Sequence, residues 1–116
     1  ATALLKREQF EAAGGHYLQA TKLAPERADA WSGLGFCFYK VENFPAALGA
    51  LQEAAKRAEP MPGNLFLRAV VEDKLQLFEE AKVSYEAFLA AQPDLPDEVW
   101  KAEQRLKTIE KILEKK

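Results

Sequence analysis

The sequence predicts an all-α fold built from repeated helix–turn–helix units. Phe10, Phe44 and Phe78 follow one another at a constant spacing of 34 residues. An alanine lies three residues after each of them, at Ala13, Ala47 and Ala81, and a bulky residue four further on, at Tyr17, Leu51 and Tyr85. A period of this length is typical of arrays of paired helices, in which neighbouring units bury one another's apolar faces. We therefore expect a surface for binding other molecules rather than an enzyme active site.

Prolines divide the chain into three blocks and indicate where helices begin or end. They lie at Pro25, in the cluster from Pro60 to Gly63, and at Pro93 and Pro96. Proline inside a helix costs roughly 3 kcal/mol, whereas the first turn tolerates it. The second helix of each unit is predicted over 9–23, 45–58 and 79–91, with a break before each repeated phenylalanine. The first helices are predicted over 28–41 and about 64–77, with only a stump ending near Arg7 in the first unit.

The last segment, 96–116, has the pattern of a capping helix. Asp97 and Glu98 follow Pro96, in a first turn where acidic side chains meet unpaired backbone amides. Apolar residues form a single stripe at Val99, Leu106, Ile109 and Leu113. Such a stripe is expected to cover the exposed end of a repeat array. The basic residues of this segment complement the helix dipole, and contact with an anionic membrane or nucleic acid is the alternative.

Composition limits the classes of partner. The chain has 116 residues, of which 48% are hydrophobic and 29% charged, which is ordinary for one soluble globular domain. A net charge of −2 gives little attraction for phosphates, so no nucleic-acid partner is expected. No apolar run approaches the roughly 18 residues that span a bilayer. Because the chain begins at Ala1, partway into a repeat, we expect that a segment precedes it; the compartment stays unassigned.

The middle unit resembles the tetratricopeptide repeat (TPR). The residues that carry the resemblance are Trp31, Leu34, Gly35, Phe38, Ala47, Leu51 and Ala54. The first unit matches from Leu4 onward through Ala20 and Pro25, and the third through Phe78, Ala81, Tyr85 and Pro93. Within the third unit, Arg68 and Glu72 replace residues that are usually apolar. They could pair four residues apart on a helix, and a one-residue shift in the phase of that helix is the alternative.

The resemblance implies a right-handed α-solenoid of antiparallel helix pairs, with about two and a half to three TPR units and a C-terminal capping helix. It implies one domain over 1–116, with an incomplete first repeat over 1–27, repeats over 28–61 and 62–95, and the cap over 96–116. The small Gly35 and Ala47 should mark the closest approach of two helices.

The resemblance also implies a concave groove, lined by the first helices, that binds a peptide or helix of another protein. The groove residues are expected to be Leu5, Ser32, Phe36, Tyr39, Lys40, Phe66, Val70, Asp73 and Lys74, with Trp100 at the far end. Members of the family that clamp a C-terminal carboxylate need asparagines where this chain has Gly33 and Phe36, so that function is not transferred. The regularly spaced Lys6, Lys40 and Lys74 form either a positive ladder or solvated helix ends. The aromatic residues either contact a ligand or pack against a neighbouring repeat.

Other functions have less support. His16 and Cys37 are alone of their kind and lie in different predicted helices, so neither a catalytic pair nor a structural zinc site is expected, and no cofactor is predicted. Cys37 is expected to fill a tight helix contact. Gly14 and Gly15 indicate either the close approach of a neighbouring helix or a local opening through which the first repeat exchanges with a second copy. Self-association through that repeat or through the last helix is therefore the alternative function, within what we expect to be a segment of a larger scaffold.

Overall fold

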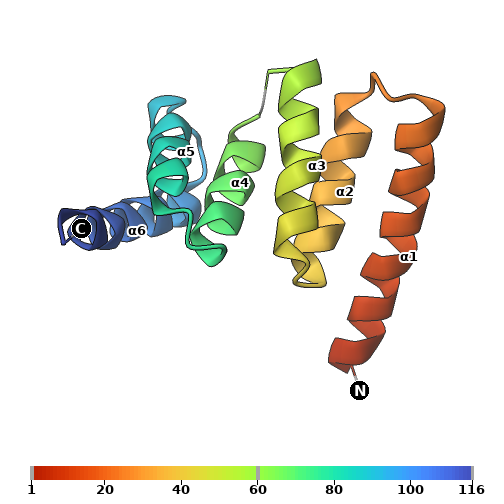
Figure 1. Ribbon diagram of the computed structural model, residues 1–116, viewed down its shortest axis with the longest axis horizontal. Helices are drawn as coiled ribbons and strands as arrows, with labels where there is room; N and C mark the ends of the chain where they lie inside the picture. The colour runs from red at the N-terminus through yellow and green to blue at the C-terminus, as the bar shows by residue number, and fades with distance from the viewer. Residues whose placement is uncertain (1, 60, 116) are drawn as a thin grey trace. The chain divides into compact units, whose positions relative to one another are not determined.

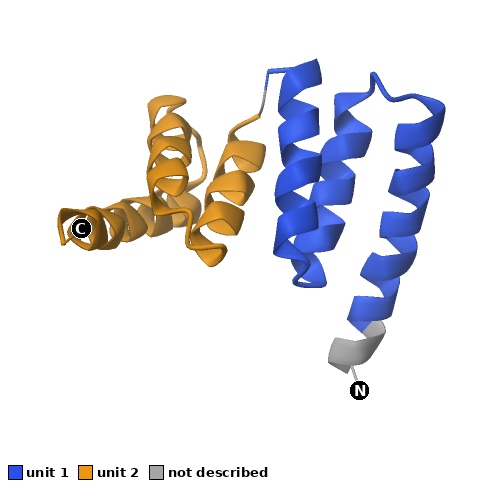
Figure 2. Ribbon diagram, in the orientation of Figure 1, with its two compact units in different colours: residues 1–60 blue, residues 61–116 orange. Residues whose placement is uncertain are grey.

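The computed structural model describes residues 2–59 and 61–115, and their side chains from residue 6 onward. This part of the chain forms six helices and no strand (Figure 1). They are α1 (Thr2–Leu23), α2 (Ala28–Lys40), α3 (Phe44–Arg57), α4 (Pro62–Lys74), α5 (Phe78–Ala90) and α6 (Pro96–Glu114). The helices form two compact units, unit 1 over Ala1–Pro60 and unit 2 over Met61–Lys116 (Figure 2). Within unit 1, α2 packs against both α1 and α3; within unit 2, α5 packs against both α4 and α6.

Two helix pairs are closed by the same tight turn. Glu42 has φ 64° between α2 and α3, and Gln76 has φ 62° between α4 and α5. The amide of Asn43 donates to the carbonyl of Phe38 at 2.8 Å, and the amide of Leu77 donates to the carbonyl of Glu72 at 2.9 Å. The left-handed conformation of Glu42 and Gln76 turns the next amide of the chain toward a carbonyl group that the helix end would otherwise leave unpaired. The repeat seen in the sequence is therefore also a repeat of backbone conformation.

The expected break between a stump ending near Arg7 and a helix starting at residue 9 is wrong. Helix α1 is continuous over Thr2–Leu23, and Glu8, which is in register with the left-handed Glu42 and Gln76, is helical. A turn at Glu8 would lose helical hydrogen bonds and impose a positive φ without any compensating contact.

Unit 1 is held together where small residues let α2 approach its neighbours. A Cβ atom on Gly35 would lie 2.8 Å from Cγ of Leu51 and 3.4 Å from the carbonyl oxygen of Ala47. The predicted closest approach of α2 and α3 is thus confirmed. A Cβ on Gly14 would lie 3.5 Å from Cβ of the buried Cys37, as expected for a close helix contact, whereas Gly15 has open space around it.

The loop between α1 and α2 is tied to α3 through one carbonyl group. The carbonyl oxygen of Pro25 accepts a hydrogen bond from Nε1 of Trp31 at 2.9 Å and another from Nε of Arg57. The Arg57 guanidinium also lies 4.8 Å from the centroid of the Trp31 ring, within cation–π distance. One end of unit 1 is therefore joined across all three of its helices.

Unit 2 has a separate core to which α6 contributes. Its buried members are Ala69, Ala81, Tyr85, Phe88, Ala102, Leu106 and Ile109. Val99 and Leu113 pack partly buried against this cluster, so the predicted apolar stripe of the last helix does cover α5. Ala69 lies one repeat of 34 residues after Gly35 and is fully buried, so no phase shift of α4 is required. The expected pair also forms, with Nε of Arg68 at 3.3 Å from Oε2 of Glu72.

Candidate peptide-binding pocket

Four of the predicted groove residues line one pocket in unit 2. Phe66, Val70, Asp73 and Lys74 are spaced so that they share one face of α4. The pocket has a volume of about 590 Å³, and its remaining lining comes from Gln76, Phe78, Tyr85, Lys101 and Arg105. Lys101 and Arg105 are four residues apart and so lie on one face of α6. Residues of α4, α5 and α6 and of the α4–α5 turn therefore surround a single hollow.

The apolar side of the pocket is aromatic and tightly packed. The Phe66 ring lies 6.1 Å from the ring of Tyr85 and 5.1 Å from that of Phe88, measured between centroids. Tyr85 and Phe88 are themselves buried in the unit 2 core. Phe66 is thus a packing residue as well as a lining residue, and its ring is held in place before any ligand arrives.

A salt bridge between α4 and α6 forms the polar wall. Nε and Nη2 of Arg105 donate to the two carboxylate oxygens of Asp73, each at 2.7 Å, and the hydroxyl of Tyr85 donates to Asp73 at 3.2 Å. The hydrogen bonds to Asp73 raise the pKa of the Arg105 guanidinium above its usual value. The Asp73 side chain is only 12% exposed. This parallel two-bond geometry is the strongest that arginine makes with a carboxylate.

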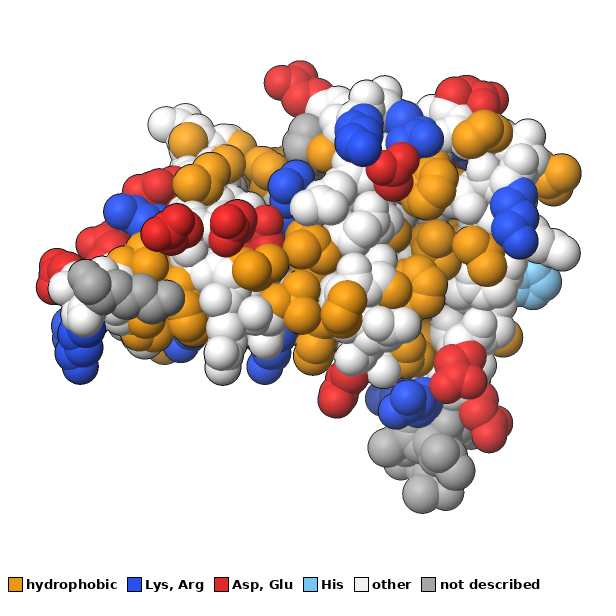
Figure 3. Space-filling model, in the orientation of Figure 1, with side chains coloured by type: hydrophobic (Ala, Val, Ile, Leu, Met, Phe, Trp, Pro, Cys, Tyr) orange, Lys and Arg blue, Asp and Glu red, His pale blue; other side chains and the backbone are white. Residues whose placement is uncertain are grey.

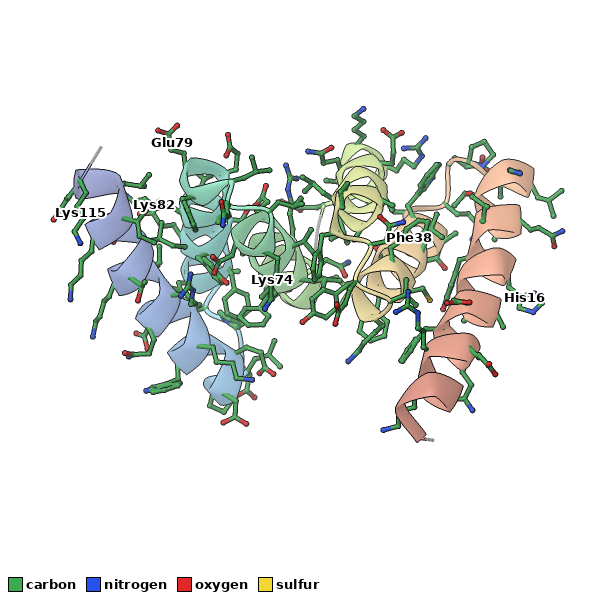
Figure 4. All side chains as sticks on the ribbon, turned by 60° about the horizontal axis from the view of Figure 1, so that its bottom comes forward. His16, Phe38, Lys74, Glu79, Lys82 and Lys115 are labelled. Atoms are coloured by element: carbon green, nitrogen blue, oxygen red, sulfur yellow. The ribbon has the colours of Figure 1, made fainter. Side chains whose placement is uncertain are left out.

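Two lysines of the pocket remain without an acidic partner. Lys74 ends α4 (Figure 4), Lys101 lies in the second turn of α6, and neither forms a salt bridge with any residue that the structure describes. Three cationic side chains and one carboxylate line the pocket, so its formal charge is 3 − 1 = +2. Elsewhere charges of both signs are interspersed on the face of each unit drawn in Figure 3. The pocket is therefore suited to an anionic group beside an apolar one.

The predicted groove residues of unit 1 form a different arrangement. Nζ of Lys40 lies 5.4 Å from the ring centroid of Phe36 and 5.9 Å from those of Phe10 and Tyr39. Phe36 is 42% exposed and meets Phe10 edge to face at 5.8 Å. Ser32 is half-buried one turn earlier on α2. Exposed aromatic surface is therefore present on unit 1, held together by contacts between α1 and α2.

The remaining two predicted groove residues are Leu5 and Trp100. The side chain of Leu5 lies outside those that the structure describes. Trp100 is 61% exposed and does not line the pocket, although Lys101 beside it does.

Sequence reasoning missed Lys101, Arg105 and Tyr85 as pocket residues. The signal for the first two is their spacing of four on the last predicted helix, which places them on one face of it.

The two residues considered for catalysis occupy unlike environments. Cys37 is a buried free thiol, and burial raises its pKa, which disfavours the reactive thiolate. His16 is exposed on α1 and points away from the helices in Figure 4. Among the described residues, no group of three or more histidine, cysteine or acidic side chains is placed to hold a metal ion. Nor is any helix in that part of the chain long and apolar enough to cross a membrane.

Comparison with known proteins identifies the fold. No protein-family model matches the sequence, and no curated protein matches it. Among solved structures, the chain is similar to the first TPR domain of Spaghetti (RPAP3) bound to the HSP90 peptide SRMEEVD. The TM-score is 0.79 at 20% sequence identity, over 94% of this chain and 83% of that one. The chain therefore has the TPR fold, an all-α array of helix pairs, as the repeat pattern predicted.

Proposed function

We propose that this chain is a protein–protein interaction module whose unit 2 pocket binds a peptide or helical segment of another protein. The segment carries an acidic side chain next to a large apolar one. The observation that carries the proposal is the combination of an aromatic floor at Phe66 with two lysines, Lys74 and Lys101, that have no acidic partner among the described residues. A role within a larger scaffold, and the division of the chain into the repeats given above, remain predictions.

The chemistry of the pocket favours this ligand over others. A carboxylate near Lys74 and Lys101 is attracted by a pocket of net positive charge, and the walls of a concave site screen that attraction less than open water does. An apolar side chain beside it gains by covering Phe66 and Val70. A basic segment would be repelled by the same two lysines.

The structural neighbour supports the class of ligand. Its bound peptide, SRMEEVD, contains two glutamates and an aspartate next to apolar residues. A sequence identity of 20% supports a shared fold and no more. In addition, this chain has Gly33 and Phe36 at the positions where a carboxylate clamp would need asparagines. The proposal for this chain therefore depends on the charges and rings of unit 2 rather than on a copied clamp.

A random decapeptide display library, selected on the purified chain, tests the proposal and does not require the partner to be identified first. We expect enriched peptides to combine Asp or Glu with a large apolar residue and to be lost with Lys74→Ala/Lys101→Ala. The matched control is Lys82→Ala/Lys107→Ala, which removes two lysines outside the pocket. No enrichment on the wild type, or equal loss with the control variant, would contradict the proposal.

Self-association is a second candidate, favoured by one observation in unit 1. Gly14 and Gly15 leave an apolar pocket of about 180 Å³ between α1 and α2, beside Leu18, which is 42% exposed. A second copy could insert an apolar side chain there. Light scattering across a dilution series is the test, because a monomer at every concentration removes this candidate.

A further inference from the structure

The guanidinium of Arg105 is already engaged inside the proposed binding pocket. Both of its hydrogen bonds to Asp73 are 2.7 Å long, and they use the paired donors with which arginine recognises a carboxylate. Asp73 comes from α4 and Arg105 from α6, so the contact is not a by-product of neighbours on one helix. Asp73 thus occupies the position that the carboxylate of a ligand would take on this arginine.

We propose that Asp73 is a specificity-determining residue: it acts as an internal competitor that withholds Arg105 from ligands and leaves carboxylate recognition to Lys74 and Lys101. The proposal rests on the proposed function, because it concerns the selectivity of the same pocket. The ligand group expected in this pocket is an acidic side chain that is bound by the ammonium groups of the two lysines. An ammonium ion is a point charge without the planar fork of a guanidinium, so the pocket discriminates weakly between aspartate and glutamate.

The surroundings of Asp73 keep the competitor in place. Its side chain is 12% exposed, and the hydroxyl of Tyr85, a buried residue of α5, donates to the same carboxylate at 3.2 Å. A ligand that captured Arg105 would leave this sheltered carboxylate without its cation, which is unfavourable. Lys74 and Lys101 have no such attachment among the described side chains and can reach a ligand without breaking a contact.

The competition can be measured with glutarate, a small dicarboxylate, by NMR titration of the whole chain. The readout is the Nε–Hε signal of Arg105, assigned by its loss in Arg105→Lys. In the wild type, glutarate should leave this signal unmoved. In Asp73→Asn, glutarate should shift it and bind about tenfold more tightly, because a charge-assisted bond to arginine becomes available. The matched control is Asp94→Asn, which removes the same charge from an exposed position outside the pocket.

Further variants separate release of Arg105 from a general change in charge or stability. The tighter glutarate binding should disappear in the double variant Asp73→Asn/Arg105→Gln. If the asparagine of Asp73→Asn still holds Arg105 by a hydrogen bond, Asp73→Ala should show the tighter glutarate binding instead. Arg105→Lys in the wild-type background should change glutarate affinity less than twofold. Arg105→Lys therefore tests whether Arg105 is withheld from glutarate even if thermal melts show that the Asp73 variants do not fold.

Two outcomes overturn the proposal: no gain in Asp73→Asn and Asp73→Ala beyond that of Asp94→Asn, or a several-fold loss in Arg105→Lys. Failure of the proposed function is recognised separately. If the peptide library yields no pocket ligand while Asp73→Asn gains Arg105-dependent glutarate binding, the competitor role stands and the peptide-binding role falls.

Discussion

Ser84 donates a hydrogen bond to the carboxylate of Glu72 across the interface between α4 and α5, where both side chains are buried. The next residue of each helix makes a second link, from the hydroxyl of Tyr85 to Asp73. Each carboxylate also meets an arginine, Arg68 for Glu72 and Arg105 for Asp73. Unit 2 therefore carries two adjacent acidic residues with different roles, one holding the helix pair together and the other facing the pocket.

The link between Ser84 and Glu72 should contribute to the stability of unit 2. Glu72 is 2% exposed, so Ser84→Ala leaves part of a buried carboxylate unsatisfied and should lower the free energy of unfolding by about 1–3 kcal/mol. Urea unfolding followed by circular dichroism measures this. Glu72→Met together with Ser84→Ala removes both polar groups and should restore much of the loss. Equal stability of Ser84→Ala and the wild type would show that the bond does not hold the interface.

Phe36 and Phe66 are both predicted groove residues but should respond differently to truncation. Phe66→Ala removes ring contacts with Tyr85 and Phe88 and should cost about 2–4 kcal/mol in thermal or urea unfolding. Phe36 is 42% exposed, and Phe36→Ala should cost only about 1 kcal/mol. Consequently, any loss of binding in Phe66→Ala must be interpreted together with its loss of stability. Similar costs for the two variants would contradict the packing described for unit 2.

Two glycines in unit 1 helices should give opposite responses to alanine. Gly49 lies in α3 with nothing within 4 Å of an added Cβ, so Gly49→Ala should stabilise by about 0.5–1 kcal/mol through lower unfolded-state entropy. At Gly35 the added Cβ would lie 2.8 Å from Leu51 and would force α2 and α3 apart, costing about 1–3 kcal/mol. Denaturant midpoints of the two variants, one above and one below that of the wild type, are the expected result.

The continuity of α1 can be tested by glycine at two positions in register. Glu42 has φ 64°, where a side chain is strained, so Glu42→Gly should stabilise by up to about 1 kcal/mol. Glu8 is helical, so Glu8→Gly should instead lower helix content near the start of α1 and cost about 0.5–1 kcal/mol. Circular dichroism and thermal melts distinguish the two effects. A gain in stability from Glu8→Gly would indicate a turn at Glu8 and contradict the continuous helix.

The helices, their pairing and most of their boundaries follow from the amino-acid sequence. Local signals carry this information: prolines in first turns, apolar residues at helical spacing, and small residues at Gly35 and Ala47 where helices must approach closely. The turn predicted at Glu8 was wrong, because the repeat pattern was present there without the packing that makes such a turn favourable. The salt bridge between Arg68 and Glu72 was predictable, because two residues that are four positions apart on a helix lie next to each other on its surface.

Which charged groups meet in the pocket depends on tertiary packing and does not follow from local sequence signals. Spacing places Lys101 and Arg105 on one face of α6, but the orientation of that face follows from the burial of Ala102, Leu106 and Ile109 in the unit 2 core. That packing brings Arg105 to Asp73, which lies 32 residues earlier in the chain. The helix period is a local property, whereas the rotation of a helix about its axis is selected by the apolar surface it covers.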